Sequence, residues 1–183
     1  MPEIEQTTIT GIVNFWREAG EDKWYVKDEE FDEICRQRFL EDHFAAARRE
    51  YESWVETPEG ALALMILLDQ FPRNFFRGTA HMYATDELAR MYAGRALEQA
   101  HDISTEAGLR VFFYLPYMHS EHLDDQRRCV DLCTEGSPSN VEYAHDHYEI
   151  IQRFGRFPHR NAILGRTTTE EEQGFLDGGG FSG

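Results

Sequence analysis

Apolar residues recur at helical spacing along most of this chain. Over residues 8–18 they place Ile9, Ile12 and Trp16 on one face, which is the pattern of a helix with one buried side. A second helix is expected after Asp28, whose side chain can accept from free backbone N–H groups at a helix start. The opening of the sequence therefore predicts two amphipathic helices.

The helix expected after Thr57 is apolar nearly all round. Thr57 can cap it, and Pro58 suits the first turn because proline has no N–H group to leave unpaired. The run from Ala61 to Leu68 contains no polar residue, so this helix should be central and buried. We expect it to stop before Pro72, since proline disfavours a helical residue ahead of it.

Cap and turn residues divide the rest of the chain into further helices. No stretch alternates polar and apolar residues for long, and the Val, Ile and Thr clusters that mark strands are missing. Because the connections are short, successive helices should pair antiparallel. The sequence predicts an all-α fold, an α-solenoid-like or irregular array. The expected helix starts are near Thr85, at Ser104 or Thr105, at Leu123, after Ser139, and after Thr168–Thr169.

Length and composition set the limits of the folded part. A chain of 183 residues with 13% aromatic content suits one domain with a sizeable core built by large side chains. Glycines crowd the C-terminal end, so residues 178–183 are expected to form a flexible tail. We therefore expect a single all-helical domain over residues 1–177.

The chain is strongly acidic, with a formal net charge of −16 and a pI of about 4.8. Such a surface repels nucleic-acid phosphates and anionic membranes. The N-terminal residues lack a charged-then-apolar signal pattern, and the longest apolar run, 61–68, is too short to span a bilayer. These features predict a cytoplasmic protein that binds neither nucleic acid nor membrane.

Two loops repeat an unusual combination, in which Phe-Pro is followed by arginine and asparagine at the end of an apolar helical run. They are residues 70–78 (QFPRNFFRG) and 153–166 (RFGRFPHRNAILGR), and they hold six of the sixteen arginines. In an acidic protein these arginines must meet internal carboxylates, a bound anion, or both. The two loops are therefore the first candidates for a functional site.

Counted from Asp69 to Gly78, the first loop offers a carboxylate, two arginines and an amide. Arg73 and Arg77 are four residues apart and can close on one anion if the turn is helical. Asn74 can cap the broken helix or tolerate a left-handed backbone. Alternatively, Asp69 pairs with an arginine and ties down the end of the buried helix.

The second loop crowds four polar side chains into one turn. A helix that begins near His159 would point free amides at an anion, with the guanidinium groups of Arg156 and Arg160 beside them. Asn161 adds a further donor. The alternative is a rigid corner whose arginines pair with internal acids.

A third candidate is the turn that contains His119 and Glu121. These two residues suit a general base and its orienting partner, or metal ligands. No HExxH spacing and no cofactor fingerprint is present, so we expect neither a metal nor a cofactor. His147, on the penultimate helix, reads as a hydrogen-bonded core residue or as a further member of the site.

Several of these segments together resemble domain-of-unknown-function family 924, a family of bacterial proteins. The resemblance implies an all-helical, tetratricopeptide-like fold and carries no established activity, substrate or cofactor. Met118 and His122 depart from the family pattern. The matching segments are 14–16 (NFW), 67–74 (LLDQFPRN), 112–116 (FFYLP), 119–121 (HSE) and 153–166.

From these segments we expect a protein that binds a small anionic or carboxylate-bearing ligand as a monomer or homodimer. Alternatives are a peptide- or protein-binding helical scaffold, and a hydrolase that uses His119 and Glu121 as an acid–base pair. His119, Glu121 and His159 would orient the ligand or move protons. The expected binding residues are Asp69, Arg73, Asn74, Arg77, His147, Arg156, Arg160 and Asn161.

Overall fold

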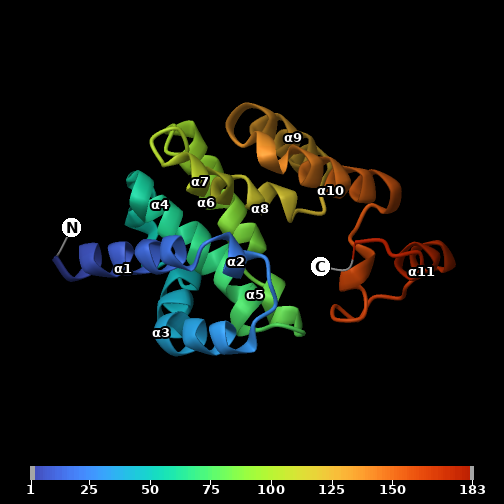
Figure 1. Cartoon of the computed structure of the whole chain (residues 1–183), viewed down its shortest axis with the longest axis horizontal. Coiled ribbons are helices and arrows are strands. Elements are labelled where there is room, and N and C mark those ends of the chain that lie inside the picture. Colours follow the sequence, from blue (N-terminus) through green and yellow to red (C-terminus); the bar gives the residue numbers. More distant parts are fainter. Residues whose placement is uncertain (1–2, 182–183) are drawn as a thin grey trace.

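The computed structural model describes the backbone of residues 3–181 and the side chains of residues 9–181 (Figure 1). This part of the chain is helical and contains no strand, which confirms the predicted all-α class. The α-helices are α1 (Glu3–Ala19), α2 (Glu21–Trp24), α3 (Glu29–Ala47), α4 (Pro58–Met65), α5 (Phe71–Phe75), α6 (Asp86–Glu98), α7 (Ala107–Arg110), α8 (Leu115–Met118), α9 (Leu123–Gly136), α10 (Val141–Phe154) and α11 (Glu170–Asp177). The shorter or wider turns are η1 (Glu52–Glu56), η2 (Ile66–Gln70), η3 (Ala80–Tyr83), η4 (Val111–Phe113), η5 (Pro138–Asn140) and η6 (Pro158–Arg160).

Local capping signals set several helix boundaries where the sequence predicts them. The Asp28 side chain accepts from the N–H of Phe31 at 3.0 Å, and the Thr57 hydroxyl accepts from the N–H of Gly60 at 3.2 Å. Helix α10 ends at Gly155, which takes the left-handed backbone conformation, φ 69°, that glycine adopts without strain. Each cap satisfies backbone groups that a helix end would otherwise leave unpaired.

The helix that begins at Pro58 continues past Pro72, contrary to the sequence expectation. It widens into the π-helical turn η2 and then resumes as α5. Because Pro72 has no N–H, carbonyl groups ahead of it lose a donor. Side chains replace it: His43 Nδ1 donates to the Leu67 carbonyl at 2.8 Å, and Thr85 Oγ1 donates to the Leu68 carbonyl at 2.6 Å. Wide turns of this kind are frequent at functional sites.

Helix α4 lies in the main hydrophobic core. Every residue from Ala61 to Gln70 is buried, and α4 packs against α1, α6 and η1. Helices α9 and α10 lie side by side and are joined by a short connection, as expected for an antiparallel pair (Figure 1). A smaller apolar cluster forms around Ile150, Ile151 and Phe157. This second cluster carries part of the candidate site.

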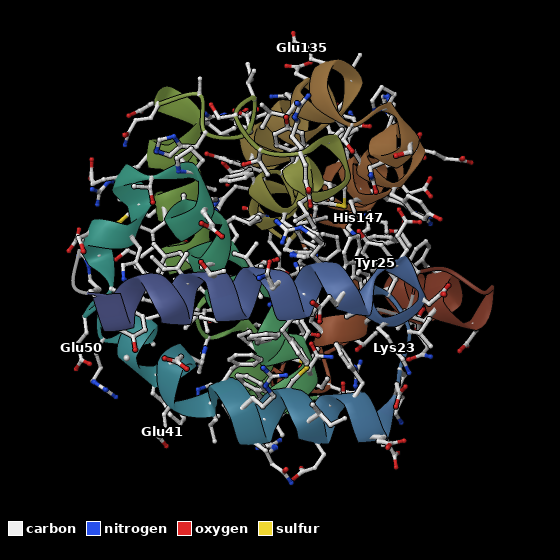
Figure 2. The ribbon with its side chains drawn as sticks, turned by 60° about the vertical axis from the view of Figure 1, so that its left-hand side comes forward. Lys23, Tyr25, Glu41, Glu50, Glu135 and His147 are labelled. Atoms are coloured by element: carbon white, nitrogen blue, oxygen red, sulfur yellow. The ribbon has the colours of Figure 1, made fainter. Side chains whose placement is uncertain are left out.

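Acidic side chains extend outward from the molecule, whereas the site described below is internal. Figure 2 shows Glu41, Glu50 and Glu135 at the periphery, with His147 further inside.

Within residues 3–181, no helix is long and apolar enough to cross a membrane. The predicted boundary at residue 177 stays a prediction. Of the predicted tail, residues 178–181 are described, and residues 182 and 183 lie outside the described part.

Candidate functional site

The site is built around the fully buried carboxylate of Asp69, in the π-helical turn. His119 Nδ1 lies 2.8 Å from Asp69 Oδ1, Arg73 Nη2 lies 3.6 Å from the same oxygen, and the Gln70 amide donates to Oδ2. Burial alone would raise the pKa of Asp69, but Arg73 and His119 lower it below its ordinary value. Asp69 is therefore an ionised, buried carboxylate.

His119 is oriented by this carboxylate. An ionised carboxylate only accepts hydrogen bonds, so Nδ1 of His119 carries the proton and Nε2 is the basic nitrogen. Burial and the nearby Arg73 charge lower the pKa of His119, against the opposing effect of Asp69. The imidazole is thus neutral at neutral pH. A carboxylate that fixes the tautomer of a histidine is a recurrent feature of acid–base sites.

Two arginines meet the carboxylate of Asp86, at the start of α6. Arg73 binds it through two contacts, at 3.1 and 3.2 Å, whereas Arg160 Nη1 lies 3.7 Å from Asp86 Oδ2. The Arg160 guanidinium carbon lies 4.4 Å from the ring centroid of Tyr83 and 4.5 Å from that of Phe157. Both rings hold the guanidinium by cation–π contact.

Arg160 is buried, but its N–H donors are not all hydrogen-bonded to acceptors of the described residues. The residue is only 7% exposed, and its Nε has no hydrogen-bond partner among the described residues. Burial, followed by repulsion from Arg73, lowers the pKa of Arg160. A buried cation normally meets well-placed acceptors on every donor. Arg160 therefore presents unfilled donors toward its surroundings.

Two histidines lie beside Arg160 around the ring of Phe157. The ring centroid of Phe157 lies 5.5 Å from that of His147 and 5.6 Å from that of His159. His147 Nδ1 donates to the Tyr143 carbonyl at 2.7 Å, and the buried Nδ1 of His159 has no partner among the described residues. Burial, together with neighbouring positive groups, lowers the pKa of each histidine to about 4.

These buried histidines predict acid lability. Between pH 6.5, the ordinary histidine pKa, and a pKa of about 4, the unfolded chain binds protons that the folded chain does not. Stability therefore falls as pH falls through this window, by up to ~3 kcal/mol for each histidine near its lower end. We expect His147→Gln to reduce this loss, measured by urea unfolding between about pH 7 and pH 5. The control is His145→Gln, which replaces an exposed neighbour and should lose as much stability on acidification as wild type. Equal losses in wild type, His147→Gln and His145→Gln would contradict the prediction.

Glu121 does not pair with His119, contrary to the sequence expectation. Its carboxylate accepts from the Phe157 N–H at 2.8 Å and pairs with Arg166 at 2.9 Å. Burial would raise the pKa of Glu121, but these partners lower it. The turn thus directs His119 toward Asp69 and Glu121 toward the second Phe-Pro loop. Glu121 fixes the loop that carries His159 and Arg160.

Asn74 and Arg77 lie at a different place, against α3. Arg77 binds the Asp32 carboxylate through two contacts, at 2.7 and 2.9 Å, and the Asn74 amide donates to the same carboxylate at 2.7 Å. They border an open cavity of about 370 Å³ that also includes Lys27 and Arg36. Their donors are therefore largely filled by an acid of the protein itself.

Arg156 and Asn161 meet the buried Glu172 of α11. Arg156 binds this carboxylate at 2.6 and 2.8 Å, and the Asn161 amide donates to it at 3.2 Å. The hydrogen bonds from Arg156 chiefly hold the pKa of Glu172 at about 2. These contacts anchor α11. The structure thus brings together Asp69, Arg73, His119, His147, His159 and Arg160, and places the other predicted binding residues in two neighbouring networks.

Comparison with known proteins identifies the family. The sequence profile of a family of bacterial proteins of unknown function, DUF924, matches residues 12–180. The chain belongs to this family. A solved structure, of a protein of unknown function from Agrobacterium tumefaciens, is 52% identical in sequence, with a TM-score of 0.92. The match covers 94% of this chain and 98% of that one. No curated protein is similar enough in sequence to match.

Three residues of this DUF924 site were not among the predicted ones. Asp86 lies in the first turn of a helix, where acidic residues are common because they stabilise the helix start. The sequence alone therefore does not mark it as the partner of two arginines. Tyr83 lies in the connection that precedes it. Phe181 carries a recognisable signal, because it is a single large apolar residue within a glycine-rich end. Among the described side chains, no group of three or more His, Cys, Asp or Glu residues is placed to hold a metal ion.

Proposed function

We propose that this protein binds a small anionic or carboxylate-bearing ligand where Arg160 meets His147 and His159. The observation that carries the proposal is the Arg160 guanidinium, which is buried between two rings and has unfilled donors. A carboxylate or another oxyanion would supply the missing acceptors, with the short, charge-assisted hydrogen bonds that guanidinium groups form.

The charges around the site favour uptake of a proton by the protein when an anion binds. Arg73 and Arg160 balance Asp69 and Asp86 while the histidines are neutral. An added anion leaves a net negative charge, which favours protonation of a neighbouring histidine. Since His147 and His159 have pKa values of about 4, bound anion should raise them. By linkage, affinity for the anion should increase as pH falls from about 6 toward 4, the range that spans the raised and the original pKa values.

Replacing Arg160 with methionine separates binding from stability. Arg160→Met should weaken binding of acetate and inorganic phosphate at least about thirtyfold, which corresponds to ~2 kcal/mol for a buried charged contact. Stability should not fall, because Asp86 retains Arg73 and an apolar side chain of similar length often replaces a buried ion without cost. Calorimetric titration and urea unfolding measure the two effects.

Arg77→Met is the matched control, because Arg77 is bound to Asp32. It should keep the wild-type affinity for acetate and phosphate. Equal affinity in Arg160→Met and wild type would contradict the proposed site. No binding by wild type of either anion would favour the peptide-binding scaffold instead.

The Asp69–His119 pair supports a second candidate, an enzyme with His119 as general base. Nδ1 of His119 is held by Asp69, which leaves Nε2 as the basic nitrogen that can take a proton from water. A hydrolase of small esters would use this group beside the anion site. His119→Gln should then abolish ester hydrolysis and keep acetate binding, whereas hydrolysis unaffected by this change would exclude the role.

The finer architecture and setting are also part of the proposal. We propose a tetratricopeptide-like array of helix pairs that acts in the cytoplasm as a monomer or homodimer. The α9–α10 pair supports the array. The buried, unbridged cysteines Cys35, Cys129 and Cys133 suit a reducing compartment.

A further inference from the structure

Phe181 covers the two histidines of the site. Its ring centroid lies 4.6 Å from that of His147 and 5.1 Å from that of His159. Figure 1 shows the chain returning from α11 toward the middle of the molecule. Phe181 is nevertheless 39% exposed, so its ring lies between the buried histidines and solvent.

Phe181 also lines a cavity of about 230 Å³. Its apolar lining comes from Ile150, Phe154, Phe175 and Phe181, and charged side chains of α10 complete it. An apolar cavity of ~150 Å³ is enough to hold benzene. The space beside Phe181 is therefore large enough for a ring-sized group, or for the ring of Phe181 itself after it turns away.

The approach of the chain to this position requires glycine. A Cβ atom on Gly180 would lie 2.5 Å from the Phe175 ring, and Gly179 has a φ of 81°, which favours glycine. These residues place Phe181 over the histidines. The N–H groups of Gly179 and Gly180 donate to the carbonyls of Leu176 and Phe175, which attaches the segment to α11. Rotation of the Phe181 side chain alone can therefore move the ring and leave α11 in place.

We propose that Phe181 is a gate, and that the ligand is a carboxylate bearing a ring-sized apolar group that takes the place of the Phe181 ring. This inference rests on the proposed function. The geometry around Phe157 supports it, because the same ring contacts Arg160 and both histidines. A carboxylate at Arg160 would thus carry its ring to the histidines. Aromatic pairs of this kind add to the apolar contribution to binding.

Benzoate and acetate test the gate as a pair of probes. In wild type, benzoate must displace Phe181 and acetate need not, so Phe181→Ala should tighten benzoate binding about threefold to tenfold and change acetate binding less than about twofold. Calorimetry at one pH measures all four affinities. Ile103→Ala, which removes another exposed apolar side chain, should match wild type.

Each contrary result has a separate meaning. Benzoate binding that is unchanged or weaker in Phe181→Ala, while acetate still binds, overturns the gate and leaves the anion site intact. An equal gain for both anions overturns the ring-sized subsite. Failure of wild type to bind either anion overturns the proposed function, and the gate with it.

Discussion

Replacing Asp69 with alanine should lower the free energy of unfolding by about 3–5 kcal/mol, the usual cost of removing one partner from a buried ion pair. Asp69 is fully buried and accepts from His119 and Gln70, and it lies close to Arg73. Its removal leaves Asp86 as the one carboxylate paired with Arg73 among the described residues, and His119 Nδ1 without its acceptor. Denaturant unfolding, with the slope checked for two-state behaviour, measures the loss.

The control is a carboxylate that forms a short ion pair at the surface. Glu106 binds Arg17 at 2.7 Å, and the two side chains are 51% and 42% exposed. Glu106→Ala should cost less than about 1 kcal/mol, because solvent screens exposed pairs. A loss below about 1 kcal/mol in Asp69→Ala as well would show that the Asp69 network is not a stabilising centre.

Replacing Glu172 with alanine should cost about 3 kcal/mol and release α11. Arg156, Asn161 and the N–H of Thr169 all donate to this carboxylate, which is 3% exposed and completes the capping box with Thr169. The change removes a cap and leaves buried donors unpaired. Hydrogen exchange should show α11 exchanging faster while α4 stays protected.

Glu171→Ala is the neighbouring control in the same helical turn. Glu171 pairs with Arg153 at 2.9 Å, but both side chains are more than half exposed. We expect it to cost less than about 1 kcal/mol and to leave α11 protected. Equal exchange in the two variants would contradict the anchoring role of Glu172. Release of α11 should also withdraw Phe181 from the histidines, since α11 carries it.

Helix boundaries and burial were the features that sequence could predict. Asp28, Thr57 and Gly155 act on groups within a few residues of themselves, so their chemistry is visible locally. The burial of residues Ala61 to Leu68 could also be predicted locally, because this run is continuously apolar. The π-helical turn was missed because it depends on His43 of α3 and on Thr85, just before α6, which donate to its carbonyls from distant parts of the chain.

Pairings across the fold were the features that sequence did not predict. His119 and Asp69 are 50 residues apart, and Arg77 and Asp32 are 45 apart, so no local spacing connects them. Sequence therefore could not divide the arginines into those that bind internal acids and those that do not. The structure makes this division, because Arg77 and Arg156 each form two short contacts with one carboxylate, whereas Arg160 forms one long contact with Asp86.

An NMR titration of the ring protons of His147 and His159, with and without excess inorganic phosphate, tests the central claim most directly, because phosphate remains an anion throughout this pH range. If the anion binds at Arg160, the titration midpoints of these histidines should move from a pKa of about 4 to higher pH by about one pH unit, which corresponds to a tenfold preference of the anion for the protonated site. Arg160→Met, titrated in the same way, should show no such movement. Midpoints that stay unchanged for both buried histidines would contradict the account.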